Sequence, residues 1–258
     1  MQQYFVNTLA MPGELIPMTK EQTHHIRRVM RMQQGDVIRV ADNSGRVLLA
    51  EVEYHQEAAA ARVVREVRDR SRTSVELILA QGMIKGEKWD YLLQKSAELG
   101  VAEIIPFVSS RCVVKIKDEK SEKKIVRWNK ILCEACEQCK RSTLVRLQPP
   151  CTFSQLSQID ADLRLIAYED ADCKSERLCE VLRAHPSPKR VLMVVGSEGG
   201  FSADEVEALT ASGFHRVSLG GRILRAETAA ISLLNSIEFY YDMAGDRKST
   251  RLNSSHCG

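Results

Sequence analysis

The sequence predicts an α/β protein in two parts, a small N-terminal β domain and a larger domain with a mainly parallel sheet. Short strand-like segments separated by turns fill the first 72 residues, whereas strand-like and helix-like segments alternate from Val75 onward. Two glycine-containing loops, at residues 196–200 and 220–221, each follow an apolar strand-like run. These loops place a ligand site in the second part.

Length and composition are typical of a globular protein with packed cores. The chain has 258 residues, 44% of them apolar, and no apolar run approaches the roughly 20 residues that span a bilayer. The N-terminal residues lack the basic and apolar segments of an export signal, so we expect a cytoplasmic protein without a membrane anchor. Lys and Arg exceed Asp and Glu only by 37 to 34, which neither requires nor excludes nucleic acid as a partner.

The first part is predicted to be a small β barrel with one short helix. Residues 19–32 carry apolar side chains at helical spacing, and strand-like segments follow at residues 37–40, 46–54 and 61–67. Turns containing Gly35 and Gly45 precede the first two of these strand-like segments. The boundary is predicted near residues 71–74, where the apolar periodicity lapses.

The second part alternates strands and helices, which is typical of a parallel sheet. Ser202 and Glu205 form the pattern of a capping box, so a helix is expected to begin directly after the first glycine loop. Strands are predicted at residues 75–80, 102–108, 163–168, 191–195 and 214–219, and helices at residues 86–99, 121–141, 202–212 and 226–243.

The two glycine loops are expected to open at one edge of the sheet, where a ligand can lie against bare backbone because no Cβ intervenes. The first loop lacks the Gly-Lys-Ser/Thr ending of a P-loop, and no Gly-x-Gly-x-x-Gly follows a strand. Residues 196–199 are not a Gly-x-Ser-x-Gly nucleophile elbow either. Nucleotide triphosphates, dinucleotides and hydrolase chemistry therefore lose support.

Three cysteines, Cys133, Cys136 and Cys139, have a spacing that also occurs in metal and cluster sites. Without an export signal, the eight cysteines of the chain are expected to be reduced. No fourth ligand at a suitable spacing is evident, so we predict packing or surface thiols and no metal.

Taken together, the two loops and two further segments resemble the SPOUT-class RNA methyltransferases, in particular those that methylate N3 of a uridine in 16S small-subunit ribosomal RNA. The further segments are Gln94-Lys95 with residues 98–101, and residues 137–141. The resemblance implies a trefoil-knot domain at residues 73–245 and a PUA-like, RNA-binding β barrel at residues 1–72. Residues 246–258 depart from the usual ending of the family and are expected to be a disordered, non-native tail.

The resemblance also implies S-adenosylmethionine as cofactor, held by the two loops. Ser197 stands where the family usually has proline, which loosens the first loop. An adenine slot is expected from Leu219, Ile223 and Leu224 around Gly220. Carried over position by position, the cofactor residues are Tyr168, Gly196, Glu198, Gly199, Gly200, Leu219, Gly220, Arg222, Ile223, Leu224 and Thr228.

Methylation of uracil N3 requires removal of its proton and stabilisation of the negative charge that spreads onto the flanking oxygens. Candidates in or beside the motifs are Arg225, Glu227, Glu137, Gln138 and Arg141, and none of them is assigned as the base. An alternative for Glu137 and Arg141 is an exposed helical pair, worth about 0.3–0.5 kcal/mol.

RNA contact is predicted in the first part from its arginines, with a solvated strand face as the alternative because acidic residues intervene. The candidates are Arg27, Arg28, Arg31, Arg65 and Arg68. The resemblance further implies ribosomal RNA of the small subunit as partner, and a homodimer. The apolar face of the closing helix serves either the core or a dimer interface.

Two rival functions remain open at this point. One is an RNA-binding or ribosome-assembly module without catalysis, which would bind RNA but not the cofactor. The other is a methyltransferase of the same class that acts on another base, on a ribose or on transfer RNA.

Overall fold

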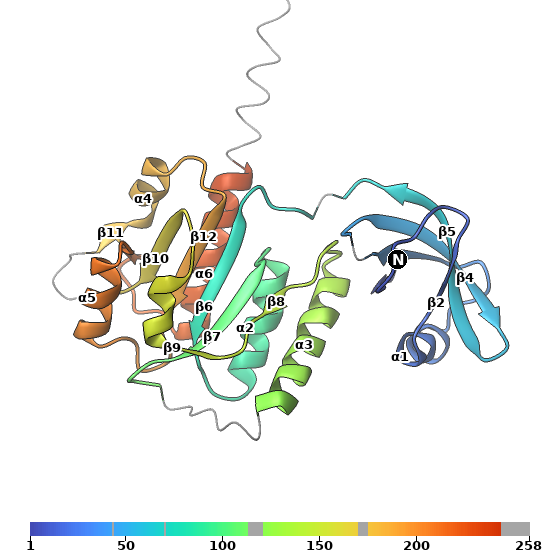
Figure 1. The fold of residues 1–258 in the computed structure, drawn as a ribbon, viewed down its shortest axis with the longest axis horizontal. Helices are drawn as coiled ribbons and strands as arrows, with labels where there is room; N and C mark the ends of the chain where they lie inside the picture. Colours follow the sequence, from blue (N-terminus) through green and yellow to red (C-terminus); the bar gives the residue numbers. More distant parts are fainter. Residues whose placement is uncertain (43, 70, 113–120, 170–174, 244–258) are drawn as a thin grey trace, which may run out of the picture. The chain divides into compact units, whose positions relative to one another are not determined.

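The computed structural model describes residues 1–42, 44–69, 71–112, 121–169 and 175–243, and the chain forms two compact units (Figure 1). The first unit comprises Met1–Arg72 and Cys133–Leu144, and the second comprises Thr73–Leu132 and the chain from Val145 onward. The predicted tail at residues 246–258 lies outside the described residues.

The first unit is a five-stranded sheet that curls around its own core as half a barrel (Figure 1). Neighbouring strands are antiparallel except β1 and β3, which are parallel, and the order is β1-β3-β4-β5-β2. The strands are β1 (Gln3–Phe5), β2 (Leu15–Pro17), β3 (Val37–Ala41), β4 (Val47–His55) and β5 (Ala58–Val67). Alternation of buried and exposed residues along β3 and β4 builds a core that includes Ile38, Val40 and Leu48.

One helical segment accompanies this sheet, as predicted for residues 19–32. The helix α1 (Lys20–His24) begins at Thr19, whose side chain accepts a hydrogen bond from the N–H of Gln22 in a capping box. It continues as the π-helical turn η1 (His25–Val29), where Ile26 is fully buried.

A distant stretch of sequence completes the first unit. Gln3 Nε2 donates a hydrogen bond to the carbonyl of Arg141 over 2.5 Å, and Ser142 N donates to Ser71 Oγ over 3.0 Å. The structure therefore adds to the first unit a segment that the predicted boundaries leave in the second. The boundaries themselves, at residues 72 and 245, stay predictions.

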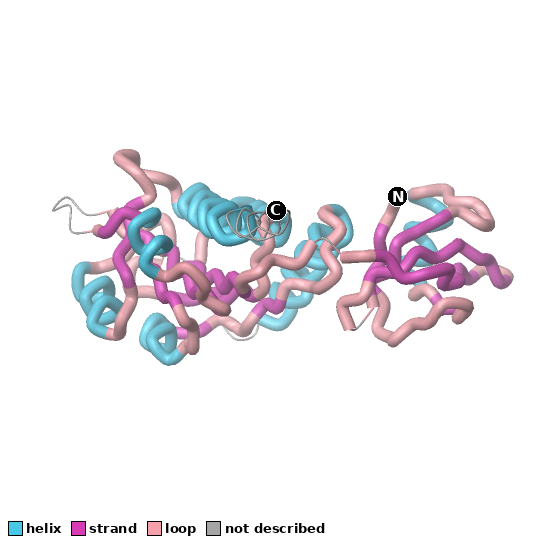
Figure 2. The backbone as a smooth tube through the Cα atoms, turned by 90° about the horizontal axis from the view of Figure 1, so that it is seen from above, coloured by secondary structure: helices cyan, strands magenta, loops and turns pink. Residues whose placement is uncertain are grey.

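The second unit is a parallel sheet with helices on both faces (Figure 2). The strand order is β11-β13-β10-β12-β6-β7-β8, and β9 also pairs with β7. The strands are β6 (Glu76–Gly82), β7 (Glu103–Val108), β8 (Arg146–Leu147), β9 (Cys151–Thr152), β10 (Leu163–Ala167), β11 (Glu176–Arg177), β12 (Arg190–Val195) and β13 (His215–Ser218). Because both faces are covered, β12 reads as a continuous apolar run and is buried from Val191 to Val195.

The helices of this unit follow the strands along the chain. The helices α2 and α6 pack against each other, and α6 contacts β6 and β12. They are α2 (Glu87–Glu98), α3 (Ser121–Gln138), the 3-10 helix η3 (Phe153–Gln158), α4 (Leu178–Ala184), α5 (Ala203–Ala211), α6 (Ala226–Glu238) and the π-helical turn η4 (Phe239–Met243).

The predicted fold class is confirmed: an α/β chain with a parallel sheet in the second unit and a β domain at the N-terminus. The closing helix directs Leu234, Ile237 and Tyr241 into the core, where each is at most 7% exposed. These three residues of its predicted apolar face therefore pack in the core, whereas the fourth, Ile231, is half-buried. Within the described residues no helix is long and apolar enough to cross a membrane.

Candidate functional site

The carboxyl ends of three adjacent strands meet at one edge of the parallel sheet. The strand β10 lies between β13 and β12, and the chain continues from these strands into Tyr168, Leu219 and Gly196, respectively. Since ligands of open α/β sheets bind beyond the carboxyl ends of the strands, this edge is the candidate site.

A cavity of about 580 Å³ opens there, which we call the loop pocket. It is bordered by the first glycine loop, the segment before α6 and the residues that follow β7 and β10. Its lining residues are Lys88, Arg111, residues 167–169, residues 195–201, residues 223–227 and Ala229.

The first glycine loop is held by the end of β6. The buried Gln81 donates a hydrogen bond from Nε2 to the carbonyl of Gly196 over 2.9 Å. A Cβ at Gly82 would lie 2.5 Å from Ser197 N, so only glycine permits this close approach of the two backbones. Lys85 N also donates to Glu198 Oε1 over 3.1 Å. These contacts fix the loop.

Two glycines of the loops leave backbone open to a ligand. Gly200 has φ +65° and Gly220 has φ +117°, conformations that favour glycine, and nothing lies within 4 Å of where their Cβ atoms would be. Gly199 differs, because a Cβ there would lie 2.6 Å from the carbonyl oxygen of Arg111. The first loop is thus packed on one side and bare on the other.

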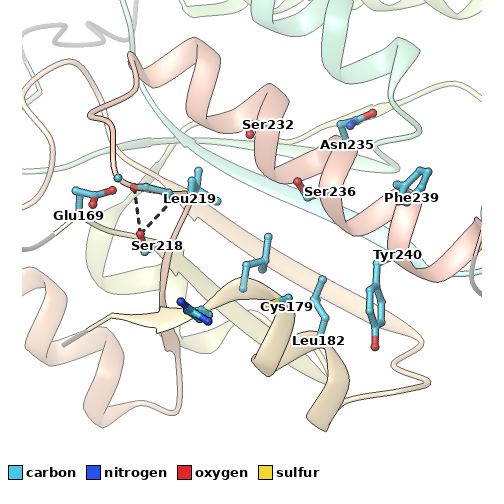
Figure 3. Close-up of a pocket in the computed structure, with 14 residues that line it drawn as sticks. Glu169, Cys179, Leu182, Ser218, Leu219, Ser232, Asn235, Ser236, Phe239 and Tyr240 are labelled. Carbon is cyan, nitrogen blue, oxygen red and sulfur yellow. Dashed lines mark hydrogen bonds between the residues drawn. The ribbon is translucent and has the colours of Figure 1, made fainter. Parts of the chain in front are cut away.

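A second cavity, of about 720 Å³, lies between α4 and α6, and we call it the helix groove (Figure 3). Leu219 and Gly220 of the second loop line one end, and Cys179 and Leu182 of α4 line a side. Phe239, 64% exposed, and Tyr240 border it beyond the end of α6. Glu169 lines both cavities.

The predicted cofactor residues are divided between these cavities. Tyr168, Gly196, Glu198, Gly199, Gly200, Ile223 and Leu224 line the loop pocket. Leu219 and Gly220 line the helix groove, whereas Arg222 and Thr228 are exposed and line neither of the two. The three apolar residues of the expected adenine slot thus lie in two neighbouring cavities.

Two of the predicted catalytic residues, Arg225 and Glu227, line the loop pocket. The Glu227 side chain is 13% exposed, and its Oε1 lies 3.6 Å from Lys88 Nζ. Arg225 and Arg111 are exposed and make no hydrogen bond or ion pair to any described residue through their side chains. Lys88 and Arg111 were not singled out in the sequence. Both residues follow strands, β6 and β7, that end at this edge of the sheet. Their position after those strands could have indicated that they belong to the site.

The other two, Glu137 and Arg141, belong to the first unit. Glu137 Oε1 accepts a hydrogen bond from Phe5 N over 3.3 Å, and burial raises the pKa of this carboxyl to about 7. Arg141 is 8% exposed. Neither residue is part of an exposed helical pair, so that alternative is wrong. Gln138 is exposed at the end of α3.

The predicted RNA-binding arginines lie toward opposite ends of β5. Arg27 donates to the carbonyl of Glu57 over 2.9 Å and stacks on Tyr54, with its Cζ 4.8 Å from the ring centre. Arg28 and Arg31 are exposed on the same helical segment, next to the turn that precedes β5. Arg65 and Arg68 are exposed at the far end of that strand. The arginines therefore form two clusters.

The cysteine run lies at the end of α3. Burial and the nearby Glu137 raise the pKa of the Cys133 thiol to about 12, which disfavours the thiolate that binds metal. Cys136 is fully buried. In the part of the chain that the structure describes, no three His, Cys, Asp or Glu side chains are grouped to hold a metal ion.

Comparison with known proteins gives two family matches and several relatives. Residues 71–238 match the model of an RNA methyltransferase domain, and residues 19–55 match an RNA methyltransferase PUA domain. The chain is 34% identical to the ribosomal RNA small subunit methyltransferase E of Bacillus subtilis, over 94% of this chain and 98% of that protein.

Solved structures agree over almost the whole length. A putative methyltransferase from Legionella pneumophila with bound S-adenosylmethionine is 33% identical, with a TM-score of 0.82 over 91% of this chain and 96% of that one. The ribosomal RNA small subunit methyltransferase E of Neisseria gonorrhoeae, bound to S-adenosylmethionine, is 26% identical, with a TM-score of 0.84 over 93% of this chain and 98% of that one.

Proposed function

Because this chain belongs to the RNA methyltransferase family, we propose that it transfers a methyl group from S-adenosylmethionine to N3 of a uridine in small-subunit ribosomal RNA. The observation that carries the proposal is the loop pocket, in which the first glycine loop meets candidate acid and base groups of the segment before α6. Relatives that share most of this chain are small-subunit ribosomal RNA methyltransferases, and two structural neighbours bind S-adenosylmethionine. We expect the reaction to take place in the cytoplasm.

The residues of the loop pocket fit the proposed cofactor. The absence of a Cβ at Gly200 lets a ligand approach the backbone closely, and Leu224 and Phe201 offer apolar surface for an adenine. Gly220 offers the same freedom in the second loop. When bound, S-adenosylmethionine supplies a methyl group on a positively charged sulfur.

The protein has to align the acceptor nitrogen, exclude water and stabilise charge, because no covalent nucleophile is needed for this displacement. We assign Arg225 to the negative charge that develops on a uracil oxygen, since this residue lines the loop pocket and its guanidinium is unpaired within the described residues. Removal of one such donor costs a factor of about 10²–10³ in turnover.

Arg225→Ala tests this role. We expect the rate of methylation to fall by about two orders of magnitude, while the affinity for S-adenosylmethionine, measured by calorimetry, stays within about threefold. Arg164→Ala, at a half-buried site on β10 that lines neither cavity, is the control and is expected to retain full activity. Near wild-type turnover of Arg225→Ala would exclude the role.

We propose that the first unit binds ribosomal RNA through its exposed arginines. Arg28, Arg31, Arg65 and Arg68 are free of partners within the described residues, so their planar donors remain available for phosphates. Arg27 is engaged by Glu57 and Tyr54 and contributes less.

We also propose that the enzyme is a homodimer in which the helix groove takes part in the interface. An aromatic side chain as exposed as Phe239, next to Leu182 and Leu178, is typical of a protein contact surface. Phe239→Glu is expected to shift the mass seen by light scattering from dimer to monomer. A monomeric wild-type protein at micromolar concentration would contradict the proposal.

The rival functions give different results in one experiment. Nucleosides of ribosomal RNA from a strain without the gene are mapped by mass spectrometry, with and without the gene restored. A methyl group restored on N3 of a uridine supports the proposal, and one restored on another atom favours the rival methyltransferase. An RNA-binding module without catalysis would restore none, and its purified protein would not bind S-adenosylmethionine.

A further inference from the structure

Lys88 and Glu227 form a charged pair inside the loop pocket. Each lies in the first turn of its helix, α2 and α6, and these two helices pack against each other. Lys88 Nζ lies 3.6 Å from Glu227 Oε1, and the side chains are 42% and 13% exposed. The lysine therefore reaches solvent while the carboxylate is largely enclosed.

The second carboxylate oxygen of this pair lacks a partner. Glu227 Oε2 is buried and accepts no hydrogen bond from any described residue. An enclosed acceptor of this kind costs free energy unless a donor reaches it, so it requires an explanation. Glu227 borders the cavity, so a small movement of its side chain would bring this oxygen to a donor carried by the substrate.

The other two acids of the loop pocket have different surroundings. Glu198 Oε1 already accepts the N–H of Lys85 and ties the first loop in place. Glu169 is exposed at the rim that the two cavities share. Glu227 is thus the acid of the pocket that combines enclosure, a cation at one oxygen and a free acceptor at the other.

The charges around Glu227 match one edge of uracil. That edge presents O2, N3–H and O4, an acceptor, a donor and an acceptor in a row. Lys88 and Arg225 are donors, and the carboxylate of Glu227 is an acceptor. Cytosine presents an unprotonated N3, and guanine presents two neighbouring donors, so either base would leave a charged group of the pocket unmatched.

We infer that Glu227 accepts the N3 proton of the target uridine and that Lys88 is a positioning residue that keeps this carboxylate ionised and oriented. The inference rests on the proposed function. The N3–H bond breaks and its proton passes to Glu227. The electron pair of N3 forms the new bond to the methyl carbon, and the bond from that carbon to sulfur breaks with its electron pair left on the sulfur.

Glu227→Gln removes the base and retains an oxygen that can face Lys88. We expect the single-turnover rate on unmethylated small ribosomal subunits to fall by about 10²–10⁴, the range of general base catalysis. The dissociation constant of S-adenosylmethionine, measured by calorimetry, is expected to stay within about threefold. Glu87→Gln is the matched control, because it removes one exposed negative charge in the first turn of α2.

Lys88→Met tests the positioning role through the pH profile. The positive charge of the lysine stabilises the negative charge of the carboxylate, so its removal is expected to move the acid limb of the rate profile to higher pH. Lys88→Arg is expected to restore the wild-type limb. Lys189→Met, at an exposed site before β12, controls for the loss of one positive charge. In the double variant, Lys88→Met is expected to add little to Glu227→Gln.

The outcomes separate this inference from the proposed function. A wild-type protein that binds no S-adenosylmethionine or methylates no RNA would overturn both. An active wild type with a Glu227→Gln variant that keeps more than about a third of its rate would overturn the inference alone. Loss of S-adenosylmethionine affinity by more than about tenfold at unchanged rate would also overturn it, since Glu227 would then hold the cofactor. If the acid limb of the rate profile is not shifted in Lys88→Met, Lys88 does not position the carboxylate of Glu227.

Discussion

The negative charge of Glu137 destabilises the folded state at neutral pH. Its carboxyl has an ordinary pKa of 4.5 and a raised pKa of about 7 in the folded protein, chiefly because burial disfavours the charged form. The folded state therefore binds the proton more tightly than the unfolded state. Its contribution to stability is fully present below pH 4.5 and is lost as the pH rises through 7.

Glu137→Gln removes this titration and keeps an acceptor for the N–H of Phe5. We expect wild type to lose about 1–2 kcal/mol more than the variant between pH 5 and pH 8, after allowance for the solvent that still reaches the carboxyl. Urea unfolding at four pH values in this range measures the difference. Parallel pH dependences of the two proteins would show that the carboxyl is not perturbed.

Ser197 carries a buried hydroxyl without a hydrogen-bond partner among the described residues, in the loop where the family usually has proline. Ser197→Ala removes this unsatisfied group and is expected to raise the free energy of unfolding by about 1 kcal/mol. Chemical denaturation checks the value, with the half-buried Ser232→Ala as control. A destabilised Ser197→Ala would mean that the hydroxyl has a donor or acceptor in solution.

At the scale of elements, the helix α5 depends on the capping box that follows the first glycine loop. Ser202 Oγ accepts from Glu205 N over 3.2 Å, and Glu205 Oε2 accepts from Ser202 N over 2.9 Å. Glu205 Oε1 also accepts from Ser110 N over 2.8 Å, which ties the start of α5 to the residues after β7. The cap therefore supports the loop pocket as well as the helix.

Ser202→Ala is expected to cost about 1 kcal/mol of folding free energy, the usual value of an N-cap. Ser212→Ala, at the other end of the same helix, is the control for the loss of a hydroxyl there. Thermal unfolding of the two variants side by side measures the difference. Equal stabilities would contradict a structural role for the cap.

The elements that the sequence predicts well are those with long periodic patterns. The helix predicted at residues 86–99 is α2 (Glu87–Glu98), and the strand predicted at residues 191–195 is part of β12. The strands β1 and β2 have three residues each, too few for a period-two pattern to emerge. The seven-residue helix α4 was also missed, because most of its stability comes from tertiary packing.

For the whole molecule, the two arginine clusters of the first unit predict the salt dependence of RNA binding. Each phosphate that a side chain neutralises contributes about 0.7–0.9 to the slope of log affinity against log salt concentration. The double variants Arg28→Ala/Arg31→Ala and Arg65→Ala/Arg68→Ala are therefore each expected to reduce the slope by up to about 1.8.

Titration of labelled ribosomal RNA at several salt concentrations gives these slopes. A reduction in only one double variant would assign RNA contact to one end of β5. Unchanged slopes in both would support the solvated strand face as the role of these arginines.

The sequence predicts those residues of the site that lie within recognisable motifs, but it does not predict contacts between separate segments. The glycine loops lie after β12 and β13, as expected of apolar runs that end in glycine. The pairing of Lys88 with Glu227 depends on how α2 packs against α6, and no pattern in either segment specifies it. Likewise, Glu137 shares a motif with Arg141, but its environment is set by burial in the first unit, where it accepts a hydrogen bond from the backbone of Phe5.

The discontinuity of the first unit bears on how the chain folds during its own synthesis. Its last segment, Cys133–Leu144, emerges from the ribosome 72 residues after Arg72, the difference between positions 144 and 72. At 5–20 residues per second, this interval lasts about 4–14 s. During that time the hydrogen bonds of Gln3, Phe5 and Ser71 cannot form, because their partners Arg141, Glu137 and Ser142 have not been synthesised. The nascent N-terminal sheet is therefore incomplete and accessible to chaperones and proteases.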